Sequence, residues 1–271
     1  LVSSSNSART LVPAGPMNES WRGVAFQPDA SWPVTPMPVG YETGTNLTVG
    51  NILFVVATNA SAAAKAGDAA VLDRLTRVLG HQVTVMHDAV AQTSHASGRH
   101  LVIVSSSSVS GNVNTKFRDV AVPVINWDRS LVDDFRIGAV ASSTTSSSNL
   151  VITPAGAGHP AVGGFSAGTR VIRTGATAMS VASATGLAPG AQVLATANNL
   201  PAVILVEQGQ LLLNSQAAPA RRIHMSWGDE GLTGVNATGL ELFDVAVAYA
   251  LSGSSSTLVY AYLIATDTRT V

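Results

Sequence analysis

Residues 52–57, with the sequence ILFVVA, form an unbroken apolar run that a strand with one solvated face would not carry. A short run rich in β-branched and aromatic residues is typical of a strand buried on both faces of a parallel sheet. A helical pattern follows at about 68–79, and a second strand pattern at 82–86. Strand, helix and strand at this spacing predict a right-handed crossover and a fold of the α/β class.

The alternation continues along the chain. A short helix is predicted over 112–118, and the later part is rich in strands. The further predicted strands are 100–104, 122–125, 150–152, 170–172, 192–195, 202–206, 210–213 and 222–225.

The last helix of this region is marked by its start. Thr238 and Glu241 have the spacing of a capping box, and the apolar body runs to Leu251. We therefore predict, over residues 49–252, a flavodoxin-like parallel sheet with helices on both faces.

Two arms are expected to flank this domain. Residues 1–48 hold six of the twelve prolines, which fix φ and remove a donor, so this stretch should be extended or turned. After Gly253, residues 257–265 predict one more strand beyond the closed domain, within a C-terminal segment 253–271. Aromatic residues in such arms are candidates for assembly contacts: Trp21, Trp32, Tyr41, Tyr260 and Tyr262.

The composition restricts the classes of function. Cysteine is absent, which excludes disulfides, thiolate metal sites and a cysteine nucleophile. Charged residues make up 11%, against a usual share of about 25%, so small uncharged residues must cover the surface. This suits an extracellular or cell-surface protein that packs against copies of itself.

A net charge of −1 without a basic run argues against binding of nucleic acid, and no apolar stretch is long enough to span a bilayer. Arg221 and Arg222 are interpreted as a solvated strand edge.

Several segments together resemble the class I glutamine amidotransferase-like superfamily, most of all its ThuA-like branch and the exported relatives of that branch. They are the apolar run at 52–57 and the stretches 67–88, 101–128, 158–160 (GHP) and 220–231 (ARRIHMSWGDEG). The resemblance implies an α/β fold. The Cys-His-Glu triad of the glutaminases lacks its cysteine here, and Gly228-Asp229 stands where Gly-His is common, so glutamine hydrolysis is not expected.

The first arm carries a second resemblance. Residues 11–15 (LVPAG) and 20–44 resemble the opening strands of a jelly-roll module found in exported bacterial proteins. That module is longer than the stretch before Asn51, so the resemblance implies a strand pair that pairs with a sheet from elsewhere.

Ligands of open α/β sheets bind beyond the carboxyl ends of the strands. The candidate ligand-binding residues there are Asn59, Asp88, Trp127, Asp128 and His159. A catalytic alternative makes Ser106 a nucleophile, His159 its base and Asp128 the orienting acid. Because no G-x-S-x-G pattern surrounds the serine, we favour the interpretation that serines 105–108 cap a helix and satisfy backbone groups.

Other chemistry has little support. The histidines at 81, 87, 95 and 100 lack the i, i+4 spacing of a helical zinc pair, so neither a metal nor a cofactor is predicted. Among the sequons, Asn18 and Asn46 in the arm are the candidate glycosylation sites.

Two functions follow as hypotheses. The first is a non-catalytic structural subunit of an extracellular fibre or surface layer, in which copies of the chain are linked by strand exchange through the arms. The arms could equally fold back on their own domain. The alternative is a ThuA-like carbohydrate-binding or carbohydrate-processing domain, in which Trp127 would stack on a glycan.

Overall fold

The computed structural model describes residues 49–139 and 143–252. The two predicted arms, 1–48 and 253–271, lie outside the described residues. So do the candidates for assembly and glycosylation that fall on them: Trp21, Trp32, Tyr41, Tyr260, Tyr262, Asn18 and Asn46.

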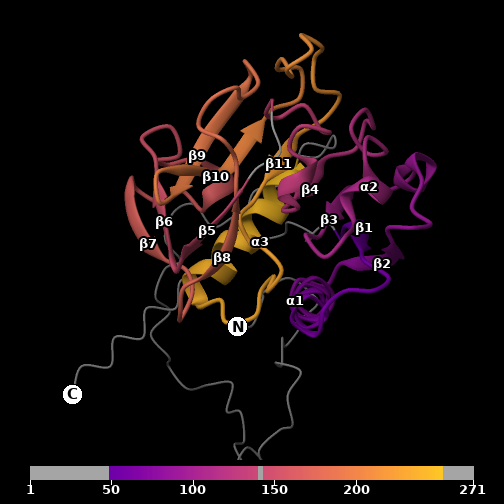
Figure 1. Ribbon diagram of the computed structural model, residues 1–271, viewed down its shortest axis with the longest axis horizontal. Coiled ribbons are helices and arrows are strands. Elements are labelled where there is room, and N and C mark those ends of the chain that lie inside the picture. Colours follow the sequence, from indigo (N-terminus) through magenta and orange to yellow (C-terminus); the bar gives the residue numbers. More distant parts are fainter. Residues whose placement is uncertain (1–48, 140–142, 253–271) are drawn as a thin grey trace, which may run out of the picture. The chain divides into compact units, whose positions relative to one another are not determined.

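One sheet of nine strands organises the described part of the chain (Figure 1). Its first half is parallel, and its second half, from β10 onwards, is antiparallel, so the sheet is mixed rather than parallel throughout. The strands, in spatial order, are β2 (Gln82–His87), β1 (Asn51–Val56), β3 (Leu101–Val104), β4 (Val124–Asn126), β11 (Arg222–His224), β10 (Leu200–Val206), β9 (Ala191–Ala197), β6 (Asn149–Ile152) and β7 (Gly168–Val171).

Strand β1 is buried on both faces, as its apolar run predicts. Ile52 and Phe54 belong to the hydrophobic cluster on one face of the sheet, and Leu53 and Val55 belong to the cluster on the other. The alternation of side chains along a strand accounts for this division. A separate two-stranded sheet is formed by β5 (Ser143–Ser147) and β8 (Thr177–Val181).

Helices are few. The α-helices are α1 (Ala62–Asp73), α2 (Ser110–Val113) and α3 (Ala237–Ser252); a π-helical turn, η2 (Arg74–Val78), continues α1. Single 3₁₀ turns are η3 (Thr93–Ala96), η4 (Arg129–Leu131) and η5 (Pro160–Val162). Among the described residues, no helix is both long and apolar enough to cross a membrane.

The helix ends differ from the expected ones. Helix α1 begins at Ala62 rather than near 68, because the Ser61 hydroxyl accepts a bond from the Ala64 amide and caps it. Helix α2 is a single turn instead of a helix over 112–118. Helix α3 is capped by Asn236 rather than Thr238, since the Asn236 Oδ1 accepts the Gly239 amide at 3.0 Å.

The strand expected at 210–213 does not form. There Leu211 makes only an isolated bridge with Ala217.

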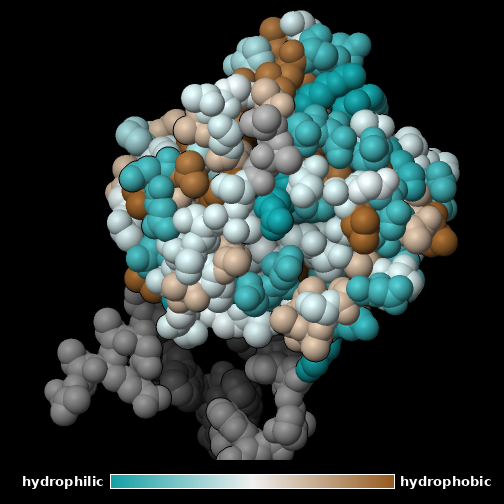
Figure 2. Space-filling model, in the orientation of Figure 1, coloured by the Kyte–Doolittle hydropathy of each residue, from teal (hydrophilic) through white to brown (hydrophobic). Residues whose placement is uncertain are grey.

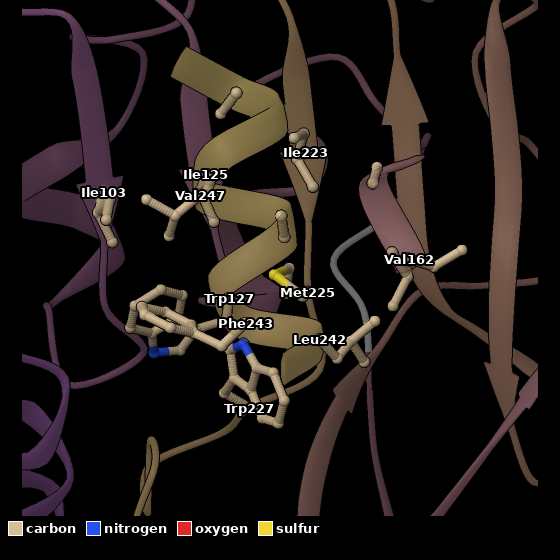
Figure 3. Close-up of a cluster of buried hydrophobic side chains, with 14 of the residues drawn as sticks. Ile103, Ile125, Trp127, Val162, Ile223, Met225, Trp227, Leu242, Phe243 and Val247 are labelled. Atoms are coloured by element: carbon tan, nitrogen blue, oxygen red, sulfur yellow. The ribbon is translucent and has the colours of Figure 1, made fainter. Parts of the chain in front are cut away.

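Helices α1 and α3 pack on the same face of the sheet. Val71 of α1 and Phe243 of α3 share the cluster that includes Phe54. Figure 3 shows α3 lying over the strands, with the Phe243 ring between Trp127 and Trp227. The opposite face is covered mainly by single turns and loops, from which Phe117, Leu131 and Phe135 reach the second cluster.

Candidate functional site

The carboxyl ends of β1, β2, β3, β4 and β11 meet at one edge of the sheet, as their parallel pairing requires. We call this the carboxyl edge. Helix α1 reaches it because Gly67 has no side chain: a Cβ there would lie 2.5 Å from the Asp229 carbonyl oxygen, which belongs to the loop after β11. The close approach brings Asp68 and Asp229 to the same edge.

Asp88, at the end of β2, is buried and holds backbone groups. Its Oδ1 accepts from the Ala89 amide at 2.7 Å, and its Oδ2 accepts from the Val109 amide at 2.7 Å and from the Asn112 side chain at 3.3 Å. The carboxylate therefore fixes the start of α2, and its acceptor positions serve the fold.

The serines after β3 form a compact hydrogen-bonded turn. The Ser105 hydroxyl donates to Asp68 Oδ1 at 2.5 Å and accepts from the Ser107 amide, and the Ser108 hydroxyl donates to the Ser105 carbonyl. Ser106 differs, because its buried Oγ has no hydrogen-bond partner in the described part of the chain. Except at Ser106, the hydroxyls satisfy neighbouring polar groups, which is the role we favoured for the run.

Asp128, just beyond β4, is the most perturbed acid of the edge. Burial raises the pKa of its carboxyl from 3.8 to about 6, and the nearby charges of Asp229 and Asp134 act in the same direction. The Ser130 amide donates to its Oδ1 at 2.9 Å and opposes the rise, as does Arg129. Asp68 is similar: burial raises the pKa of its carboxyl, the bonds from Ser105 and Ser107 lower it, and Asp229 adds to the rise.

The predicted triad does not assemble. Strand β6 runs antiparallel to the parallel half of the sheet, so the chain after it emerges at the opposite, amino edge. His159 lies there, with its ring 5.2 Å from that of Tyr249 and its Nδ1 accepting the Ala161 amide. It cannot act as a base for Ser106 or pair with Asp128, both of which stand at the carboxyl edge.

The other two predicted ligand residues follow the carboxyl ends of β4 and β1, but neither is placed as a buried ligand group. Trp127 is fully buried and packs against Phe54, with ring centroids 6.2 Å apart, and against Phe243, with ring centroids 6.5 Å apart. Figure 3 shows it beside Phe243 under α3, so it does not present a face to a sugar. Asn59 is exposed in the loop between β1 and α1. Of the five predicted ligand residues, Asn59, Asp88, Trp127 and Asp128 follow the carboxyl ends of parallel strands, but Asp88 and Asp128 are the ones that bring a buried polar side chain to this edge.

His159 takes part in a polar cluster at the amino edge instead. Glu207 accepts from the Tyr249 hydroxyl and from Arg221 Nε at 2.8 Å, and the Arg221 guanidinium lies 4.0 Å from the Tyr249 ring centroid. Burial and the Glu207 carboxylate raise the pKa of Tyr249 to about 12, and burial lowers the pKa of His159. The cluster ties the end of α3 to strands β10 and β11.

Two buried arginines were missed by the sequence interpretation. Arg222 is fully buried instead of solvated, and Arg173 is 1% exposed. Arg173 donates to the carbonyls of Trp227, Gly231 and Thr233 at 2.6–2.8 Å, so it holds the loop that carries Asp229. Nothing in the residue type or its spacing separates such an arginine from a surface one.

His224 was missed as well. It is wholly buried within β11 and neither ring nitrogen makes a hydrogen bond of normal geometry. Burial lowers its pKa to about 4, against a weaker opposing effect of the Ser180 backbone.

The described residues contain no group of three histidine, aspartate or glutamate side chains placed to hold a metal ion. The carboxyl edge thus gathers four aspartates, of which Asp88 and Asp128 are buried, beside the serine turn, and the predicted nucleophile and base are not assembled there.

No family model matches the sequence, and no curated protein matches it. Among solved structures, a ThuA-like protein from Bacteroides uniformis has a similar fold, with a TM-score of 0.53 and 9% sequence identity over 78% of this chain and 96% of that one. At that identity the likeness concerns the fold alone. The described domain thus has an α/β fold similar to that of the ThuA-like protein, built on a mixed sheet.

Proposed function

We propose that this chain is a non-catalytic structural subunit of an extracellular assembly, a fibre or surface layer, whose copies are linked by strand exchange through the arms 1–48 and 253–271. The observation that carries the proposal is an open sheet edge. Strand β2 pairs with β1 and with no other strand of the described residues, and residues 82–86 contain no charged side chain to repel another strand.

The surface supports the same conclusion. Figure 2 shows a face dominated by residues of intermediate hydropathy, with separate hydrophilic and hydrophobic patches. With 11% charged residues and a net charge of −1, copies of the chain repel one another only weakly. The site geometry agrees, because Ser106 and His159 lie at opposite edges of the sheet.

The test compares the full chain with versions lacking residues 1–48, residues 253–271, or both. We expect filaments or large oligomers from the full chain in negative-stain images and size exclusion, and monomers when both arms are removed. Equal melting temperatures by circular dichroism would show that the domain still folds. A full chain that stays monomeric at every concentration would rule out the assembly.

A carbohydrate-binding domain is the second candidate. The parallel strands have the order β2-β1-β3-β4-β11, which is the 2-1-3-4-5 order of flavodoxin-like sheets, and the similar solved fold is called ThuA-like. Asp128 and Asp229 at the carboxyl edge supply acceptors suited to sugar hydroxyls.

Titration calorimetry with a panel of mono- and disaccharides tests this candidate. We expect a ligand whose affinity falls at least tenfold in Asp128→Asn, since the loss of one charge-assisted hydrogen bond is worth about 1.5–3 kcal/mol. Asp73→Asn, on the exposed face of α1, is the matched control and should leave the affinity unchanged. Absence of heat with every sugar would remove the candidate.

A further inference from the structure

We propose that the outer edge of β2 is the acceptor site of the assembly, and that residues 257–265 of a second copy occupy it as a tenth strand. This inference rests on the proposed function and specifies which of the two arms and which of the two sheet edges make the contact.

The backbone of β2 offers free hydrogen-bonding groups on its outer side. The amides of Gln82 and Asp88 both donate to β1, to the carbonyls of Gly50 and Val56 at 2.9 Å. Along a parallel ladder, successive residues direct their backbone amide and carbonyl to opposite sides of the strand, so the backbone groups of Thr84 and Met86 also face β1. Val83 and Val85 must then direct their amides and carbonyls away from β1, toward an added strand.

The edge lacks the features that normally protect an edge strand. It pairs with β1 over six consecutive residues in unbroken register, without a bulge or a proline. Val85 is 42% exposed on the same face as the partly buried Val83, which leaves apolar surface beside the free backbone groups. Soluble proteins usually place lysine, proline or a bulge at such a position.

The other edge of the sheet is better protected. Strand β7 is four residues long and carries Arg170. The Ile172 amide donates to the Ser148 carbonyl, so the backbone groups of the preceding residue, Val171, point away from β6. The Val171 carbonyl is already occupied, because it accepts a hydrogen bond from the Asn236 side chain at 2.9 Å. Between the two edges, β2 is therefore the one that suits strand addition.

The two arms differ in their fitness as a donor strand. Residues 257–265 (TLVYAYLIA) contain no charge, proline or glycine, and they are rich in the β-branched and aromatic residues that favour strands. Nine residues suffice to cover the six of β2. Residues 1–48 contain six prolines, each of which lacks the amide donor that a sheet ladder requires.

The start of the C-terminal segment also fits an exchange. Helix α3 ends at Ser252, and Leu251 is buried against Gly50, where a glycine Cβ would lie 3.0 Å from Leu251 Cδ1. The chain therefore leaves the domain beside the start of β1. The sequence Gly-Ser-Ser-Ser at 253–256 has the composition of a linker, and a short hinge between a domain and a strand-forming segment favours exchange of that segment between copies.

Cysteine cross-linking of full-length chains tests the contact, because the protein has no cysteine of its own. One chain carries Val85→Cys, and a second, differently tagged chain carries one cysteine at a position from 258 to 263 in turn. After mixing and mild oxidation, we expect heterodimers whose yield alternates along 258–263 with a period of two, since successive strand residues point to opposite faces. A third chain carries both cysteines. If it forms only an intramolecular disulfide, and the mixed single-cysteine chains form no heterodimer, the proposal is overturned.

A pair of proline variants provides an independent test. Val85→Pro removes an amide that points outward, so it should block strand addition while keeping the pairing of β2 with β1. Val171→Pro changes the equivalent position of β7 and is the matched control, and melting temperatures verify the fold of both. We expect Val85→Pro to reduce the polymer fraction at least tenfold and Val171→Pro to leave it unchanged.

The outcomes separate the two claims. Polymers that persist in Val85→Pro would overturn the assignment of β2 while the structural function stands. An unaltered chain that remains monomeric at all concentrations would overturn both.

Discussion

Replacing Arg222 by methionine is expected to lower the free energy of unfolding by about 4 kcal/mol, because several buried carbonyls would lose their hydrogen-bond donor at a cost of about 1–3 kcal/mol each. The side chain is fully buried, and five backbone carbonyls accept its hydrogen bonds. The acceptors, at 2.6–3.2 Å, are those of Arg118, Val120, Val122, Ala220 and Arg221. Methionine fills a similar volume but donates nothing, so these carbonyls would stay buried without partners.

The charge of Arg222 is kept in the fold despite its burial. Burial lowers the pKa of the guanidinium to about 10, and Asp119 opposes the decrease, so the group remains protonated at neutral pH. Lysine would keep the charge but has three donors on one nitrogen, which cannot reach carbonyls arranged around a planar guanidinium. Arg222→Lys should therefore lose most of the same stability, about 3 kcal/mol.

Urea denaturation of the three proteins at pH 7 measures these losses. Arg77→Met is the control, because Arg77 forms an exposed i, i+4 pair with Asp73 and its removal should change the free energy of unfolding by less than about 0.5 kcal/mol. A loss below about 1 kcal/mol in Arg222→Met would mean that the carbonyls find other donors.

The buried strands were predictable from sequence, whereas the buried arginines were not. An unbroken apolar run such as 52–57 has only one environment that satisfies every residue, a strand covered on both faces. Arginine is compatible with both surface and interior, and its place is decided by carbonyls that converge on it from other segments. Arg222 donates to carbonyls of residues 118–122, about a hundred positions away in sequence, and no local sequence pattern predicts that these carbonyls meet it.

The direction of a strand posed a similar difficulty. The run at 150–152 forms a strand, as its apolar pattern predicts, but whether it runs parallel or antiparallel depends on its partners, and β6 pairs with β9 and β7. That choice moves His159 from one edge of the sheet to the other. Asp88 and Asp128 follow strands of the parallel half, whose direction the crossover rule fixes, so their place at the carboxyl edge could be predicted from the sequence, whereas that of His159 could not.

Asp128 and His224 are expected to give the protein opposite dependences of stability on pH. Asp128 has a folded pKa of about 6, above its ordinary 3.8, so its contribution is complete below pH 3.8 and is lost as the pH rises through 6. His224 has a folded pKa of about 4, below its ordinary 6.5, so its contribution is complete above pH 6.5 and is lost as the pH falls through 4. Because a tenfold change in proton affinity is worth about 1.4 kcal/mol, each contribution spans about 3 kcal/mol.

Between pH 4 and 6 one contribution therefore falls while the other rises, so their pH dependences largely offset each other and single variants are needed to reveal them. Asp128→Asn keeps the acceptor for the Ser130 amide, and its advantage over the unaltered protein should grow by about 3 kcal/mol between pH 4 and 7. His224→Leu removes ring nitrogens that make no hydrogen bond of normal geometry, and its advantage should grow by a similar amount as the pH falls from 7 to 4. Other groups, such as Asp68 and His81, titrate in every variant, so the differences in unfolding free energy from urea denaturation isolate the two residues. A difference that does not change with pH would show that the side chain titrates in the fold as it does in the unfolded chain.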